Sequence, residues 1–133
     1  MAVYVTDTHP LIWFASGKHR KLSASALRAF ERANRGEALI WVPPMALLEV
    51  GMLEKAGRVR FNSSFAHWAE ALLAQPGFAL AKMDAPVIFA ATAVSANSDP
   101  FDISIMATAQ SLDLQLITKD RAITDSSEVQ ILW

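Results

Sequence analysis

The stretch VYVTDTHPLIW, residues 3–13, decides the fold of this chain. Residues 3–6 form a short apolar, β-branched run, which predicts a strand. Residues 8–16 predict a helix that begins at once, with Pro10 in its first turn, where a missing backbone N–H costs little. Asp7 stands between the two, at the carboxyl end of the strand. A strand that leads directly into a helix predicts an α/β unit.

The rest of the chain continues this alternation of strands and helices. Further strands are predicted at 39–42, 78–83, 114–118 and 129–132, and further helices at 22–36, 45–56, 65–75, 85–95 and 100–112. Strands joined by helices form right-handed crossovers between parallel neighbours. We therefore expect an α/β fold with a mostly parallel central sheet of about four to five strands, flanked by helices, in a single domain over residues 1–133. In such sheets, ligands bind beyond the carboxyl ends of the strands.

The composition narrows the classes of function. The chain has 133 residues, of which 53% are hydrophobic and 19% charged, and it has no cysteine. The absence of cysteine excludes disulfides, thiolate metal sites and cysteine nucleophiles, and it fits a reducing cytoplasm. The longest uncharged stretch, residues 85–98, is shorter than the roughly 18 apolar residues of a membrane span. We expect a soluble, cytoplasmic protein without a signal peptide. Its net charge of −1 argues against a dedicated duplex-binding domain, which is usually basic.

Two carboxylates occupy positions that suggest chemistry. Asp7 suits either a site at a strand end or the cap of the helix that follows. Glu49 lies in PMALLEVGMLEKAG, residues 44–57, and its neighbours three and four positions away are all apolar. A carboxylate on an apolar stripe is costly unless it is paired or bound to a metal. The alternative is that Glu49 reaches solvent from a narrow polar face.

Three further acids have structural explanations as well as functional ones. In DPFDISIMATAQ, residues 99–110, Asp99 is the predicted N-cap and Asp102 lies in the first turn. Both suit the positive end of a helix, so capping explains Asp99, and Asp102 fits either role. Asp120 follows the fourth predicted strand in LITKDRAI, residues 116–123, and aspartate is also a common turn residue.

Together these acids predict a metal site. Asp7 and Asp120 at strand ends, Asp102 at a helix start and Glu49 on an apolar face can converge above one edge of the sheet. Clustered carboxylates require either raised pKa values or a divalent cation. An all-oxygen ligand set without a histidine cluster favours Mg²⁺ or Mn²⁺ over Zn²⁺. Such ions serve phosphoryl chemistry.

The four motifs, in this order, resemble those of PIN-domain ribonucleases and, among them, the VapC toxins of bacterial toxin–antitoxin modules. The resemblance covers nearly the whole chain. It implies a PIN-like, three-layer α/β/α fold and a Mg²⁺- or Mn²⁺-dependent endoribonuclease, which hydrolyses RNA phosphodiesters with a metal-activated water. The acids that the family uses for catalysis and metal binding fall on Asp7, Glu49, Asp102 and Asp120.

The resemblance also implies supporting residues and partners. Thr118 is the hydroxyl that positions a carboxylate or water, and Asp99 is a second-tier candidate. The implied partners are an RNA substrate, a cognate antitoxin and a second copy in a homodimer. The first helices would form a groove for the antitoxin tail, where we expect Trp13 and Phe14 to be incompletely buried.

Other interpretations remain open at two places, the residues after the DPFD acid and a basic run near the start of the chain. Many relatives carry an arginine after the DPFD acid, to pair with a carboxylate or steer phosphate, whereas this chain has Ile103 and Ser104. A catalytically weak PIN-like domain, or a receiver-like module with an acidic pocket, would act through metal and protein partners instead. Receivers usually carry paired acids after the first strand, where this chain has Thr6. The basic run KHRK, residues 18–21, is either a solvated loop or a contact for RNA phosphate.

Overall fold

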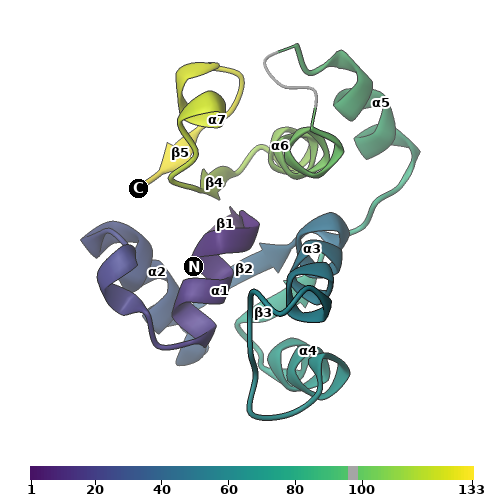
Figure 1. Ribbon diagram of the computed structural model, residues 1–133. Helices are drawn as coiled ribbons and strands as arrows, with labels where there is room; N and C mark the ends of the chain where they lie inside the picture. The colour runs from purple at the N-terminus through teal and green to yellow at the C-terminus, as the bar shows by residue number, and fades with distance from the viewer. Residues whose placement is uncertain (96–98) are drawn as a thin grey trace.

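The computed structural model describes residues 1–95 and 99–133, which form a five-stranded sheet with helices between the strands (Figure 1). The strands are β1 (Ala2–Thr6), β2 (Ala38–Val42), β3 (Phe78–Leu80), β4 (Gln115–Ile117) and β5 (Ile131–Leu132). The helices are α1 (Thr8–Ala15), α2 (Ala24–Asn34), α3 (Pro44–Lys55), α4 (Phe65–Ala74), α5 (Ala85–Ala93), α6 (Pro100–Leu112) and α7 (Arg121–Asp125), with a 3₁₀ turn η1 (His19–Lys21). The order is β3-β2-β1-β4-β5, and every neighbouring pair is parallel.

Alternating side chains of the strands build one apolar core on each face of the sheet. Ile40 and Ile117 face the core that α1, α2 and α4 cover, where Phe30 is fully buried. Val5 and Leu116 face the opposite core, beneath α6 and α7. Because successive strand residues point to opposite faces, both faces require apolar residues, which explains the continuous apolar runs in these strands. The predicted three-layer α/β/α arrangement is thereby confirmed.

The element boundaries differ from the sequence prediction at a few places. The third strand ends at Leu80 and not at residue 83, because β2 ends at Val42, whose carbonyl accepts the last ladder bond from the Ala81 N–H at 2.9 Å. Helix α7 was not predicted, since five residues are too few to show a helical period. The predicted helix over 85–95 ends at Ala93.

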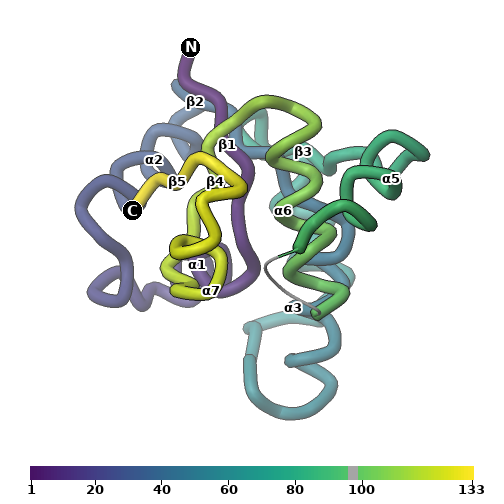
Figure 2. The backbone as a smooth tube through the Cα atoms, turned by 90° about the horizontal axis from the view of Figure 1, so that it is seen from above, coloured from purple at the N-terminus to yellow at the C-terminus, as the bar shows by residue number. Residues whose placement is uncertain are grey.

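The carboxyl ends of the strands meet at one edge, and four helices begin there. Helices α1, α3 and α7 directly follow β1, β2 and β4, while α6 precedes β4 and runs back toward its start. Figure 2 shows α1, α7 and the first turn of α6 on the same side of the molecule. The order β3-β2-β1-β4-β5 differs from the 2-1-3-4-5 order of flavodoxin-like receivers, so the receiver-like interpretation does not fit this sheet.

None of the helices in the described ranges is long and apolar enough to cross a membrane.

Candidate functional site

Asp7 lies at the carboxyl end of β1, where its backbone N–H and both of its carboxylate oxygens form hydrogen bonds. It is only 6% exposed, and its backbone N–H extends the ladder by donating to the Ile117 carbonyl at 3.0 Å. One carboxylate oxygen, Oδ1, accepts the Thr8 N–H at 2.8 Å, so Asp7 caps α1. The other, Oδ2, accepts the Thr118 hydroxyl at 2.7 Å. Asp7 therefore caps α1, as one interpretation of its position predicted, and both of its carboxylate oxygens accept hydrogen bonds.

The Thr118 hydroxyl connects Asp7 to Asp120. Thr118 is fully buried at the end of β4, where its Oγ1 donates to Asp7 and accepts the Asp120 N–H at 3.0 Å. Asp120 in turn caps α7 by accepting the Ile123 N–H at 3.2 Å. This hydroxyl therefore links the carboxylate of Asp7 to the backbone of Asp120.

Glu49 is connected to Asp7 through Thr8, a residue that the sequence pattern did not indicate. The Thr8 hydroxyl, fully buried, donates to Glu49 Oε1 in a short hydrogen bond, while the Thr8 N–H donates to Asp7. The helix face around Glu49 is less buried than its apolar neighbours suggested, since Met52 is 52% exposed. Glu49 is half-buried and bound to Thr8. A hydroxyl directly after a strand-end aspartate was the available signal for Thr8.

The electrostatics of the site centre on Asp7. Burial raises the pKa of Asp7 above its ordinary value, because an ionised carboxylate loses its hydration there. The hydrogen bonds from Thr118 and Thr8 oppose this rise, as does the nearby His9, whereas the charge of Asp120 adds to it. Asp7 and Asp120 are thus close enough to repel each other, and a bound cation would relieve that repulsion.

Asp99 and Asp102 stand at the first turn of α6. Asp99 Oδ1 accepts the N–H groups of Phe101 at 2.8 Å and Asp102 at 3.3 Å, which confirms Asp99 as the N-cap. Asp102 is half-buried in the first turn, at the same edge of the sheet as Asp7. Ser104 is buried, and its hydroxyl donates to the Phe101 carbonyl at 2.9 Å. The first turn of α6 therefore has a polar contact of its own at Ser104.

The acids do not form a ready-made metal cage. Within residues 1–95 and 99–133, no three or more His, Asp or Glu side chains are grouped closely enough to hold a metal ion. The pair Asp7 and Asp120 nevertheless fits Mg²⁺ or Mn²⁺, because Mg²⁺ is usually bound through one or two carboxylates together with waters and substrate phosphates. Burial raises the pKa of Asp7, and a cation bound beside it would favour the ionised form.

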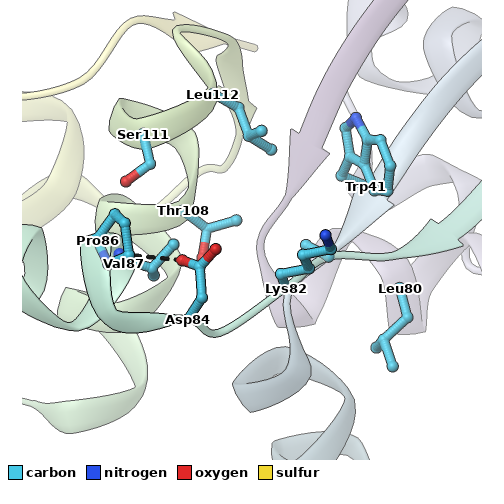
Figure 3. A pocket seen from close by; sticks show the side chains of 10 residues that line it. Trp41, Leu80, Lys82, Asp84, Pro86, Val87, Thr108, Ser111 and Leu112 are labelled. Carbon is cyan, nitrogen blue, oxygen red and sulfur yellow. Dashed lines mark hydrogen bonds between the residues drawn. The ribbon is translucent and has the colours of Figure 1, made fainter.

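A hollow of about 380 Å³ opens directly over this pair. It is lined by Asp7, His9, Pro10, Trp13, Lys119 and Asp120. A different hollow, of about 400 Å³, lies between the β2 and β3 strands and helices α5 and α6 (Figure 3). Trp41 and Leu80 line one side of it and Leu112 the other, and its one carboxylate, Asp84, caps α5 by accepting the Val87 N–H. None of the predicted site acids lines this second hollow.

Comparison with known proteins agrees with the fold. The PIN domain family model matches residues 4–128. A chain in the crystal structure of VapBC2 from Rickettsia felis, bound to a DNA fragment from their promoter, superposes with a TM-score of 0.70 at 13% identity, over 98% of this chain and 97% of that chain. A chain of a toxin-antitoxin complex from Klebsiella pneumoniae gives 0.63 at 19% identity, over 95% and 94%. VapBC-1 from nontypeable Haemophilus influenzae gives 0.63 at 15% identity, over 98% and 96%. No curated protein matches the chain.

The solved structures, all below 20% identity, establish the likeness of fold, and the family model covers nearly the whole chain. The chain belongs to the PIN domain family, whose members are nucleases.

Proposed function

We propose that this chain, as a single PIN-like domain over residues 1–133, is a Mg²⁺- or Mn²⁺-dependent endoribonuclease and the VapC-type toxin of a type II toxin–antitoxin pair. One observation carries the proposal. A continuous hydrogen-bonded chain runs from Asp120 through Thr118 to Asp7, and from Asp7 through Thr8 to Glu49. It holds three acids at the edge of the sheet where this class of fold binds its ligands.

In this proposal, some of the acids bind the metal and one orients the attacking water. Asp7 and Asp120 are the metal ligands whose proximity the structure supports best, and Asp102 and Glu49 complete the proposed set. A bound divalent cation supplies a water of lowered pKa as the nucleophile and offsets the charge of the scissile phosphate. Glu49 has one carboxylate oxygen engaged by Thr8, which leaves Oε2 to accept a hydrogen bond from the attacking water and orient it.

The supporting residues keep these carboxylates in place. Thr118 occupies Asp7 Oδ2 and so prevents the buried carboxylate from rotating about its χ angles. Asp99 fixes the first turn of α6, on which Asp102 stands. Preorganisation of this kind is worth several kcal/mol in other active sites, because no reorganisation is needed during the reaction.

A cognate antitoxin and a second copy of this chain are the proposed partners. The solved toxin–antitoxin structures of similar fold support the antitoxin. A hollow of about 240 Å³ among α1, α2, α4 and β3, which Phe14, Trp68 and Leu72 help to line, offers room for apolar side chains of its tail. Phe14 is incompletely buried there, as expected. Exposed Leu80, Phe89 and other apolar side chains around α5 support a homodimer.

The first test is cleavage of a mixed RNA pool by the purified, antitoxin-free chain in Mg²⁺, in Mn²⁺ and in EDTA. Glu49→Gln, prepared in parallel, controls for contaminating nucleases. We expect cleavage that needs both the metal and Glu49. A folded chain that binds metal and cleaves nothing in the pool would contradict a general endoribonuclease. It would favour the catalytically weak, partner-binding alternative, which Ile103 and Ser104 in place of the family's arginine keep open.

A further inference from the structure

We infer that single-stranded RNA reaches the acids along a basic groove between α1 and α3, defined by Lys18, Lys21, Arg58 and Arg60. The inference rests on the proposed function, and it names the surface that holds the substrate's phosphates. The groove is a hollow of about 570 Å³ that follows α1 from His9 to Ser16 and is closed by the end of α3 and the residues after it.

The charge of the groove differs from that of the whole chain. Four of the twelve lysines and arginines line it, and no carboxylate does, although the net charge of the chain is −1. The one salt bridge among residues 1–95 and 99–133 joins Arg35 to Glu37, far from the groove in sequence. The four cations therefore have no carboxylate partner in the part of the chain that the structure describes, and their charge is available to an anion.

The backbone places two of these cations by the same device. Gly17 follows the C-cap of α1 and Gly57 follows the C-cap of α3, each in the left-handed region, with φ of 72° and 76°. The next residue folds back onto the helix: the Lys18 N–H donates to the Trp13 carbonyl at 2.7 Å, and the Arg58 N–H donates to the Leu53 carbonyl at 2.9 Å. These are Schellman motifs.

The negative ends of the two helices favour nearby cations, which accounts for Lys18 and Arg58. It does not account for Lys21 and Arg60, which line the same hollow from outside the helix ends. A convergence of four cations from two separate segments is better explained by an anionic ligand with several charges.

The groove leads into the acidic site. His9 and Trp13 line both the groove and the hollow over Asp7 and Asp120. Trp13 forms their common wall, with Lys21 Nζ 5.7 Å from its ring centroid and the His9 ring 6.0 Å away. The eight residues of α1 span roughly 12 Å, which is long enough for a short run of successive phosphates.

A single strand of RNA fits these features better than the alternatives. A single basic groove in an otherwise acidic chain suits single-stranded backbone, whereas duplex binding usually needs a broad basic face. An acidic protein segment would match the positive charge of the groove, but nothing would attract it further, toward the acids that the groove adjoins. A phosphodiester strand would be drawn toward them, because a divalent cation held by Asp7 and Asp120 would attract its next phosphate.

The test measures binding apart from cleavage. Fluorescence anisotropy follows a labelled 12-nucleotide RNA of mixed sequence, in EDTA, at several KCl concentrations. For Arg58→Gln with Arg60→Gln we expect a Kd raised roughly tenfold near 0.1 M salt, and a salt slope reduced by about 1.4, since each lost phosphate contact removes about 0.7 from a single-strand slope. The matched controls are Arg20→Gln, from the same basic run, and Arg28→Gln on α2. Neither residue lines the groove, so both variants should bind like wild type.

The outcomes separate this inference from the proposed function. If wild type cleaves RNA while the folded double variant binds the 12-mer with an unchanged Kd and salt slope, the groove is overturned and the nuclease stands. If the wild-type chain binds the 12-mer but does not cleave RNA, and the double variant binds the 12-mer more weakly, the groove stands and the nuclease fails. A labelled acidic peptide of twelve glutamates, bound by wild type in place of RNA, would overturn the inference in favour of a protein ligand. Lys21→Gln repeats the measurement if the double variant does not fold.

Discussion

Two groups of carboxylates stand at the same edge of the sheet and are held in different ways. Asp7 is buried, and its carboxylate is bound to Thr118, 111 positions away in the chain. Asp99 is exposed, and its carboxylate accepts N–H groups only two and three positions further on. The first arrangement exists only when β1 and β4 pair, whereas the second forms with its own helix. If the proposed function holds, acids of the first kind couple stability to chemistry, whereas acids of the second kind can be changed with little effect on the fold.

The largest expected effect is on cleavage by Asp102→Asn. Asp102 lies in the first turn of a helix that forms without its charge, so we expect metal-dependent cleavage to fall about 100-fold or more with little change in Tm. Initial rates on the RNA pool and thermal unfolding measure the two effects. A folded variant that cleaves at the wild-type rate would remove Asp102 from the site.

Changes to the buried contacts of Asp7 should lower the stability of the fold. Thr118→Val keeps the shape of the side chain but leaves Asp7 Oδ2 and the Asp120 N–H without their partner. We expect a loss of about 1–3 kcal/mol in the free energy of unfolding, measured by urea denaturation. The control is Thr92→Val, because the exposed Thr92 hydroxyl donates only to the Phe89 carbonyl in its own helix. Equal losses in the two variants would contradict a special role for Thr118.

The same distinction explains how much the sequence could predict. The alternation of strands and helices predicted the layered fold, and the positions after strands predicted Asp7 and Asp120 at one edge. Asp99 as an N-cap was also predictable, since its partners are its neighbours. The bond from Thr8 to Glu49 spans 41 positions, and the one from Thr118 to Asp7 spans 111. No local pattern specifies such pairs, because they depend on the register of strands and on helix packing. The basic groove likewise requires two segments about 40 residues apart.

Mg²⁺ should raise the Tm of the wild-type chain by a few degrees at millimolar concentration. In the proposed function the cation binds beside Asp7 and Asp120 in the folded chain and relieves their repulsion, so mass action would favour the folded state. Differential scanning fluorimetry with and without EDTA measures the shift. Asp120→Asn should lose most of it and Asp99→Asn little. No shift in the wild type would argue against a preformed site.

Asp7 should also make stability depend on pH in the absence of metal. Its pKa is raised in the folded state, so the folded chain binds this proton more tightly than the unfolded chain does. The cost of ionising Asp7 is absent below its ordinary pKa, grows as the pH rises, and is fully present above the folded-state pKa. Asp7→Asn lacks this cost.

The stability of Asp7→Asn relative to wild type should therefore increase from about pH 4 toward neutrality, by about 1.4 kcal/mol for each unit by which the pKa is raised. Urea unfolding in EDTA at a series of pH values measures the difference. A constant difference across this range would mean that Asp7 is not the group responsible.

The smallest effects are expected for changes to Asp99, whose hydrogen bonds are local, and they distinguish a capping role from a chemical one. If Asp99 acts as a helix cap, Asp99→Ala should cost about 1 kcal/mol of stability, whereas Asp99→Asn, which keeps a capping oxygen, should cost only a few tenths. Cleavage by Asp99→Asn should then stay near the wild-type rate, and Asp99→Ala should lose only what a loosened first turn costs in placing Asp102. If Asp99→Asn instead loses as much cleavage as Asp102→Asn while its Tm is unchanged, the charge of Asp99 serves the chemistry. Asp99 and Asp102 would then both be locally held acids that serve the chemistry.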